Sequence, residues 1–368
     1  MQTIYLNHAG TSWPKPPPVV AATGSTFHAE PARWPELFAA AHETAADFFH
    51  VEPSRLLLTP SCTAALQLAV QDHSWRPGDR VLTSHFEHHA LQRSLVKLED
   101  LGVVVTALPY SDEEPIPLDA LEAELKRGSV RLLALTAACN VTGRLLPISE
   151  ATALAHRFGA LALIDGAQIA GWWDLDVAAL EADLFTFAGH KGPQAPWGVG
   201  GLYVRPELPM KCPAAVCDIA ELQARPAAVM PGYCDAGSAN LAAVAGLAAA
   251  CQWLATPAQQ GRLQTARDLA ASFTESVRQM PRVTVHHDTP METKVPTVAI
   301  SVAGATSTDL ADQLRVQGLI ASAGFQCAPQ AHRALGTTES GALRFSFGPS
   351  NQTGDVHRAV EMLDQLLT

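Results

Sequence analysis

The sequence predicts an α/β fold: a large domain with a mostly parallel seven-stranded sheet, followed by a smaller C-terminal α/β domain. Between about residues 55 and 205, short apolar runs rich in β-formers alternate with longer helical stretches, a pattern typical of parallel strands with helices on both faces. The chain has 368 residues, too many for one compact core. After Val204 the composition changes to a Pro- and Ala-rich stretch, which indicates the end of the first sheet.

Seven apolar runs are the predicted strands of the large domain, and four helices are predicted between them. The strands are Arg55–Thr59, Arg80–Ser84, Val103–Leu108, Val130–Ala137, Leu161–Asp165, Leu184–Ala188 and Gly201–Val204. The helices are Thr63–Gln71, His89–Leu101, Leu118–Lys126 and Ser149–Phe158. Because sites in such sheets form at the carboxyl ends of the strands, the polar residues after each run are the candidate site residues.

An Ala-rich helix over Ala239–Leu254 is predicted to link the two domains. The predicted domains are residues 16–254 for the large one, and residues 1–15 with 255–368 for the small one. The strands of the small domain are predicted at Val283–His287, Thr297–Val302, Leu319–Ala323 and Ala342–Phe347, and its helices at Thr308–Gln317 and Asp355–Leu367.

Composition and charge exclude several classes of protein. Hydrophobic residues make up 48% of the chain and charged residues 17%, so a disordered protein is excluded. The net charge of -11 argues against nucleic acid or an anionic membrane as the main partner. No signal peptide or membrane span is expected, and the seven scattered cysteines contain no CxxC pair that predicts a metal site. We therefore expect a cytoplasmic protein with free thiols.

The strongest local signal is LALIDGAQ followed by DLFTFAGHKGP. Asp165 ends one apolar strand, and Lys191 follows the next one in a Gly-rich turn. A lysine that forms a Schiff base needs partial desolvation, which lowers its pKa and frees its lone pair. A carboxylate such as Asp165 can face a pyridinium nitrogen and keep that ring an electron sink. Each residue alone also fits a surface lysine or a strand-end cap, but the pair favours a pyridoxal-5′-phosphate (PLP) site.

Several motifs, in order along nearly the whole chain, resemble class V aminotransferases of PLP fold type I, in the cysteine desulfurase and selenocysteine lyase branch. They are IYLNHAGTSWPKP, TPSCTAALQLAV, TSHFEHHALQRS, TAACNVTGRLLPI, DGAQ, AGHKGP, DAGSAN, GFQCAPQAHRALG and LRFSFGPSN. The resemblance implies that Lys191 carries PLP as a Schiff base and that Cys327 takes sulfur from the substrate. It also implies that the Arg344 guanidinium pairs with the substrate α-carboxylate, a geometry that suits a planar fork of donors.

The resemblance also implies roles for the residues around the cofactor. Free N–H groups at Cys62 and Thr63 would hold the phosphate, although Thr63 also fits an ordinary helix cap. His88 would lie over the ring as a proton shuttle, Gln168 would contact the phenolic oxygen, and His190 would contact the phosphate. Asn140 would lie near O3′ and the substrate carboxylate, with Ala9 and Gly10 beside the substrate. In a homodimer, Ser238 would reach the phosphate of the partner subunit.

The chain departs from the family pattern at several positions. Ser322 and Gln326 stand where the branch usually has an Arg and a His near the nucleophile, so Cys327 has fewer obvious activators. Ala188 stands where a hydroxyl residue commonly contacts the phosphate. His8 and Gly10 vary the usual opening segment.

The leading functional hypothesis is a PLP-dependent cysteine desulfurase that converts L-cysteine to L-alanine and leaves a persulfide on Cys327. The alternatives are another class V enzyme, namely a C–S or C–Se lyase, an epimerase or a transaminase, or a catalytically weak homologue that binds PLP. Replacing Cys327 by Ala separates a desulfurase from a transaminase or an epimerase. A sulfur-acceptor protein is a further expected partner.

Overall fold

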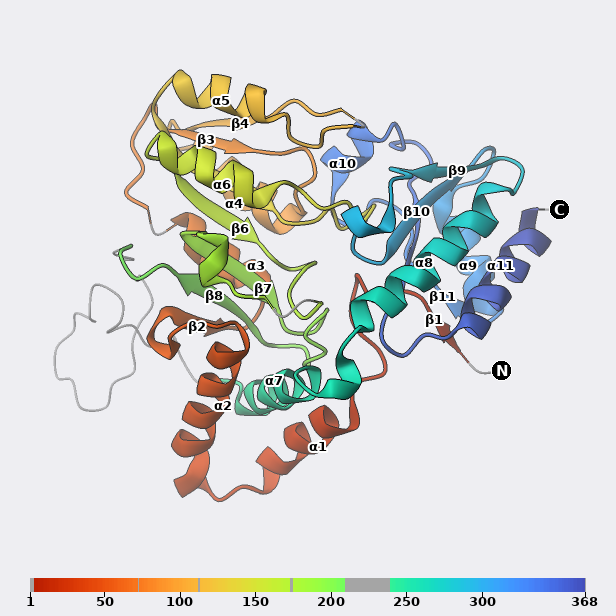
Figure 1. Ribbon diagram of the computed structural model, residues 1–368, viewed down its shortest axis with the longest axis horizontal. Coiled ribbons are helices and arrows are strands. Elements are labelled where there is room, and N and C mark those ends of the chain that lie inside the picture. The colour runs from red at the N-terminus through yellow and green to blue at the C-terminus, as the bar shows by residue number, and fades with distance from the viewer. Residues whose placement is uncertain (1–2, 72, 112, 173–174, 209–238, 368) are drawn as a thin grey trace.

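The computed structural model describes residues 3–71, 73–111, 113–172, 175–208 and 239–367. Its main element is a seven-stranded sheet in the order β2-β8-β7-β6-β5-β3-β4 (Figure 1). All neighbouring pairs from β7 to β4 are parallel, and β8 runs antiparallel to both β7 and β2. The strands are β2 Leu56–Thr59, β3 Arg80–Thr83, β4 Val104–Ala107, β5 Val130–Thr136, β6 Leu161–Asp165, β7 Leu184–Ala188 and β8 Gly200–Val204.

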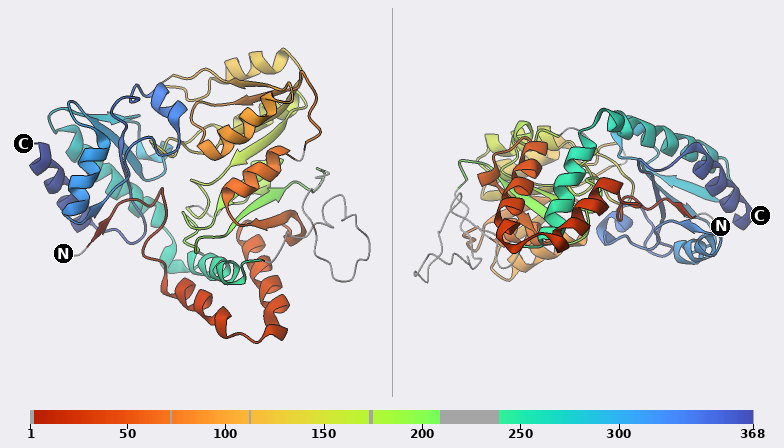
Figure 2. Two further views of the ribbon diagram at one scale, coloured as in Figure 1. Left: turned by 180° about the vertical axis from the view of Figure 1, so that it is seen from behind. Right: turned by 90° about the horizontal axis from the view of Figure 1, so that it is seen from below.

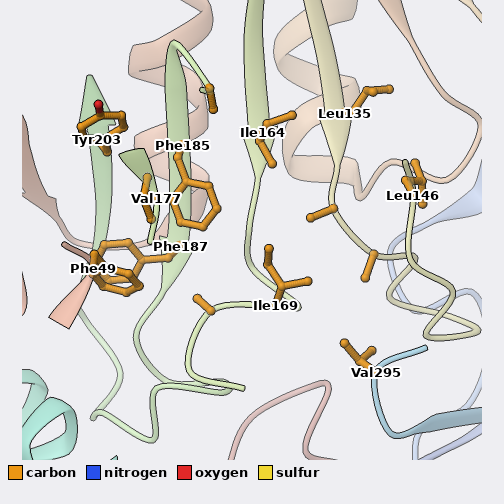
Figure 3. Packing of buried hydrophobic residues seen from close by; sticks show 14 of the residues in the cluster. Phe49, Leu135, Leu146, Ile164, Ile169, Val177, Phe185, Phe187, Tyr203 and Val295 are labelled. Atoms are coloured by element: carbon orange, nitrogen blue, oxygen red, sulfur yellow. The ribbon is translucent and has the colours of Figure 1, made fainter. Parts of the chain in front are cut away.

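Helices cover both faces of this sheet, because its strands present apolar side chains alternately to the two sides. In β5, Leu133 and Leu135 face the core that contains α2, α5, α6 and α7, whereas Leu132 and Ala134 face the core of α3 and α4. Figure 3 shows part of the first core, including the rings of Phe49 and Phe187, which contact each other at a tilt of 35°. The helices are α1 Pro17–Ser25, α2 Trp34–Phe48, α3 Cys62–Gln71, α4 His89–Glu99, α5 Leu118–Lys126, α6 Ile148–Arg157 and α7 Leu241–Leu254.

The C-terminal part has its own sheet and its own core. The three-stranded antiparallel sheet has the order β12-β10-β9, and β1 pairs with β11 in a separate two-stranded parallel sheet. The elements are β1 Ile4–Tyr5, α8 Arg262–Arg278, β9 Val283–His286, β10 Thr297–Val302, α9 Ser307–Val316, β11 Leu319–Ile320, α10 Pro329–Ala334, β12 Leu343–Ser346 and α11 Thr353–Leu367.

The first strand belongs spatially to the C-terminal part, so that both chain termini lie on the same side of the molecule (Figures 1 and 2). Ile4 and Leu6 are buried in the same cluster as Phe273, Phe345 and Leu363. This separate core supports the division into residues 16–254 against 1–15 with 255–368, which stays a prediction.

Most predicted strands are found within one or two residues, but one strand was predicted too long and several helices were not predicted. The strand predicted at Leu319–Ala323 ends at Ile320, because Ser322 instead forms an isolated bridge to Arg344. The linking helix is found within two residues of its predicted bounds and begins at Leu241, where the N-cap residue Asn240 accepts a hydrogen bond from the Ala243 N–H at 3.1 Å. The helices α1, α2, α8 and α10 were not predicted, although α8 buries a regular apolar face.

By length and composition, no single helix among the described residues is long and apolar enough to cross a membrane. One bent pair of helices, Leu241–Leu254 with Pro257–Arg278, passes that test jointly. Most residues of α7 are buried inside the protein.

Candidate active site

A cavity of about 350 Å³ lies at the carboxyl ends of the parallel strands, where the N-terminal segment and the C-terminal part approach the large sheet. This is the edge at which an α/β sheet brings together the side chains that follow its strands. The residues around the cavity are Asn7, Ala9, Gly10, Ser61, Cys62, Thr63, Leu66, His88, Ala90, Asn140, Asp165, Ala167, Ala188, His190, Lys191, Ser322, Gln326, Cys327 and Arg344.

Asp165 and Lys191 both line this cavity, as the sequence predicted. Asp165 ends β6 and is buried, and its Oδ1 accepts hydrogen bonds from the Ala167 N–H at 2.9 Å and the Cys62 thiol at 3.5 Å. Burial raises the pKa of Asp165 and lowers the pKa of Lys191. Both shifts have the same cause, because a low-dielectric site disfavours each charged form. The Lys191 amine is therefore more readily neutral than a surface lysine.

Glycine is required in the turn that carries Lys191. A Cβ atom on Gly192 would lie 2.1 Å from the backbone oxygen of Ala170, so only glycine permits this close approach. On the other side of the lysine, the carbonyl of His190 accepts hydrogen bonds from the N–H of Ser12 at 2.9 Å and the amine of Lys15 at 3.1 Å. The turn is thus fixed on both sides of the functional amine.

His88 is the N-cap residue of α4, and this position determines its tautomer. Its Nδ1 accepts a hydrogen bond from the Ala90 N–H at 3.1 Å, so the ring proton of the neutral form is on Nε2. Burial, followed by the positive charge of Lys191, lowers the pKa of His88 to about 3. The imidazole that lines the cavity is therefore neutral at pH 7, with an N–H available to the site.

The first turn of α3 forms one end of the cavity. The Ser61 hydroxyl accepts from the Ala64 N–H at 3.2 Å, and the first N–H groups of a helix have no partner within the helix itself. A Cβ on Gly200 would lie 2.6 Å from the Cys62 nitrogen, so the glycine in β8 lets this helix start close to the sheet. Unpaired N–H groups and the helix dipole favour an anion here. Thr63 is exposed at this end, and Ala188 lines the cavity without a hydroxyl.

Arg344 is buried in β12 and lines the cavity. It is therefore not a solvent-exposed arginine, although β12 is an edge strand of its sheet. Its Nη1 donates to the Asn140 carbonyl at 2.8 Å and its Nη2 donates to Asn7 Oδ1 at 3.0 Å. Both acceptors are uncharged, and the Nε–H has no hydrogen-bond partner within the described part of the chain. Burial lowers the pKa of Arg344 to about 10. A buried guanidinium with a free N–H is suited to bind a carboxylate.

Cys327 is on the loop between β11 and α10, as predicted, and it lines the cavity from the C-terminal part. It is exposed, whereas Cys62, Cys139 and Cys251 are buried. The Cys327 carbonyl accepts a hydrogen bond from the His89 N–H at 2.7 Å, directly beside His88. The thiol thus lies on the same cavity as Lys191.

Gln168 and Asn140 do not offer their amide N–H groups to the cavity as expected. Gln168 is buried, but its amide donates to the Ala9 carbonyl at 3.2 Å and it is not among the cavity residues. Ser238 lies outside the described residues. Asn140 lines the cavity, but its Nδ2 donates to the Gln326 carbonyl at 2.8 Å, so its amide oxygen is the atom without a partner among the described ranges.

Three residues of the site were missed from the sequence. Asn7 accepts from Arg344, and Lys15 binds the turn before Lys191 through the His190 carbonyl. Glu87 is fully buried beneath the site, where its carboxylate contacts the Ser84 hydroxyl. The sequence did contain a signal for Glu87, because it is an acidic residue shortly after an apolar strand.

The residues present fit PLP. The α3 end suits a phosphate, Asp165 suits a pyridinium nitrogen, and Lys191 supplies the amine. Buried polar atoms around the cavity, namely His190 Nδ1, Asn140 Oδ1 and Arg344 Nε, have no hydrogen-bond partner among the residues that the structure describes. Because such atoms are usually satisfied, their concentration here is consistent with a polar ligand.

Comparisons with known proteins agree with this site. Residues 4–359 match the family model Aminotransferase class-V. The chain is 30% identical to cysteine desulfurase CsdA of Escherichia coli (strain K12), over 99% of this chain and 94% of that protein. The crystal structure of Escherichia coli CsdA superposes with a TM-score of 0.89 at 28% identity and covers 100% of this chain and 96% of that one.

An apo cysteine desulfurase from Thermococcus onnurineus NA1 has the same fold, with a TM-score of 0.91 at 24% identity over 99% of this chain and 94% of that one. These findings confirm the predicted resemblance and the predicted fold class. The chain belongs to the aminotransferase class-V family.

Proposed function

We propose that this protein is a PLP-dependent cysteine desulfurase that converts L-cysteine to L-alanine and leaves a persulfide on Cys327. The observation that carries the proposal is the placement of three side chains around one cavity of about 350 Å³: Lys191, Arg344 and Cys327. An amine, a carboxylate-binding guanidinium and an exposed thiol are the groups that this reaction requires. The similarity to cysteine desulfurase CsdA supports the assignment.

Lys191 would carry the cofactor through its amine, with the phosphate at the first turn of α3 and the ring nitrogen toward Asp165. When bound, PLP withdraws electrons from the substrate Cα through its protonated ring. Asp165 is held by the Ala167 N–H and the Cys62 thiol, so its carboxylate is fixed before any ligand arrives. Such preorganised charge costs no rearrangement during the reaction.

Arg344 would bind the α-carboxylate of the substrate and thereby orient Cα toward Lys191. The lowered pKa of Lys191 favours the neutral amine, the form that would remove the Cα proton. His88 is neutral and presents Nε2–H, so it would donate a hydrogen bond into the cavity, and its role as a proton shuttle stays a prediction. The roles of Asn140, Gln168, His190, Ala9 and Gly10 remain predictions.

The sulfur step is balanced without an added oxidant or reductant. The Cys327 thiolate forms an S–S bond to the substrate sulfur while the Cβ–S bond breaks, and the electron pair of the broken bond goes to Cβ. Protonation of Cβ then gives alanine. The net change is one thiol and one cysteine converted to one persulfide and one alanine.

Several finer properties belong to this proposal. We propose a homodimer, in which Ser238 of one subunit reaches the phosphate of the other, and a sulfur-acceptor protein that receives the persulfide sulfur. A role in sulfur metabolism and a cytoplasmic location follow from the same assignment and stay predictions.

The test is to purify the protein, record its visible absorbance, and measure alanine and sulfide formed from L-cysteine with a thiol reductant. We expect a visible band and equimolar alanine and sulfide. Cys327→Ala should keep the band and lose alanine formation, while Cys251→Ala, at a buried thiol outside the cavity, is the matched control. A protein that binds PLP but forms alanine equally well without Cys327 would refute the desulfurase assignment.

A further inference from the structure

The loop that carries Cys327 has an unusual backbone. Gln326 and Cys327 are consecutive non-glycine residues with positive φ angles of 41° and 56°. Side chains with a Cβ rarely adopt this left-handed region, and they persist there only when surrounding contacts hold them. The contacts around Gln326 therefore determine where the Cys327 thiol lies.

The side chain of Gln326 is fixed at both of its polar atoms. Its Nε2 donates to the Ala342 carbonyl at 2.8 Å, and its Oε1 is 2.9 Å from His332 Nε2. On the other side of the imidazole, His332 Nδ1 lies 2.7 Å from the Thr337 hydroxyl. His332 itself is fully buried in the last turn of α10.

The Ala342 carbonyl determines the direction of each hydrogen bond in this network. The Ala342 oxygen can only accept, so the Gln326 amide nitrogen faces it and the Gln326 oxygen must accept from His332 Nε2–H. His332 Nδ1 then accepts from the Thr337 hydroxyl. The side-chain polar atoms of Gln326, His332 and Thr337 all have partners in this partly buried network, and satisfied networks of this kind favour one fixed arrangement.

The backbone of the same loop is attached to the opposite side of the cavity. The Gln326 carbonyl accepts from Asn140 Nδ2 at 2.8 Å, and the Cys327 carbonyl accepts from the His89 N–H at 2.7 Å. The loop thus spans from this hydrogen-bond network in the C-terminal part to the loop after β5 and to the start of α4. Cys327 is held between these attachments.

We propose that Gln326 is the positioning residue of the Cys327 thiol: its amide, held between His332 and the Ala342 carbonyl, fixes the left-handed backbone that presents the thiol to the cavity. The inference rests on the proposed function for its effect on turnover. Gln326 does not bind the substrate carboxylate, which is assigned to Arg344, so its loss affects the sulfur step rather than substrate binding.

The test uses the full-length, PLP-loaded protein and Gln326→Met, which keeps the side-chain volume and removes both hydrogen bonds. We expect kcat for alanine formation to fall about 10- to 100-fold, because small misplacements of a reacting group have effects of this size. KM for cysteine should stay within about twofold. Gln326→Glu, which keeps the acceptor for His332 and loses the donor to Ala342, should show a loss in the same direction. Gln313→Ala, on the exposed face of α9, is the control.

A second readout does not need turnover. Hydrogen exchange of a peptide covering residues 322–330 should become about tenfold faster in Gln326→Met, while a peptide covering β6 stays unchanged. The inference is wrong if both variants keep kcat and loop exchange within twofold of wild type, or if exchange rises throughout the protein. If the wild-type protein forms no alanine, the proposed function fails, and the exchange comparison still decides whether Gln326 orders the loop.

Discussion

Glu87→Gln provides a sharp test of the electrostatics beneath the site. Glu87 is fully buried after β3, where Oε1 is 2.5 Å from the Ser84 hydroxyl and Oε2 accepts from the Thr136 N–H at 2.7 Å. Both partners are uncharged, and burial raises the pKa of Glu87 from 4.5 to about 8. Glutamine has nearly the same shape as the protonated carboxyl, so the substitution removes only the titration.

The sign and size of the effect follow from linkage. A pKa raised in the folded state gives a stabilisation that is complete below pH 4.5 and is lost as the pH rises through about 8. Within this window each pH unit changes the free energy of unfolding by about 1.4 kcal/mol. Between pH 5 and pH 7, wild type should therefore lose about 2 to 3 kcal/mol relative to Glu87→Gln.

The assay is urea unfolding of both proteins at a series of pH values from 5 to 8, with the difference in unfolding free energy plotted against pH. All other titrating groups are shared, so they largely cancel in this difference. Glu361→Gln, at an exposed position of α11, is the matched control and should give a flat line. A flat line for Glu87→Gln as well would refute a protonated, buried Glu87.

Three further substitutions test the site. Arg344→Lys should raise KM for cysteine about 10- to 100-fold in steady-state alanine assays, because a charge-assisted hydrogen bond to the buried guanidinium contributes about 1.5 to 3 kcal/mol; an unchanged KM would contradict carboxylate binding by Arg344. Lys191→Ala should lower kcat at least about 10³-fold and shift the visible band of the bound cofactor; retained turnover would remove Lys191 from the reaction. Gly200→Ala should lower stability by about 1 to 3 kcal/mol in thermal unfolding and weaken PLP binding, because its Cβ would lie 2.6 Å from the Cys62 nitrogen and 2.7 Å from the Phe187 oxygen; a variant with normal stability and affinity would argue against the close packing of α3 on β8.

Much of the site could be predicted because strand ends are visible in the sequence. Asp165 and Lys191 follow consecutive apolar runs, and parallel strands bring their carboxyl ends to one edge. The resemblance of ordered motifs then indicated the cofactor and the candidate nucleophile Cys327. Gly-rich turns such as the one at Gly192 were recognisable for the same local reason.

What the sequence could not give was the direction in which polar side chains point. Gln168 and Asn140 were both expected to offer their amides to the cofactor, but Gln168 donates to the Ala9 carbonyl and Asn140 donates to the Gln326 carbonyl. These acceptors are backbone atoms far along the chain, so no local pattern announces them. Glu87 was overlooked for the same reason, since its burial depends on neighbouring strands.

The sequence by itself determined the alternation of strands and helices, the sheet edge at which the site forms, and the chemical types of its residues. These properties depend on apolar periodicity and turn chemistry, which act over a few residues. Only the tertiary structure decided which groups meet: Arg344 with Asn7, separated by 337 positions, and the Cys327 loop with Asn140. Such contacts arise from the packing of distant segments, so their geometry exists only in the folded chain.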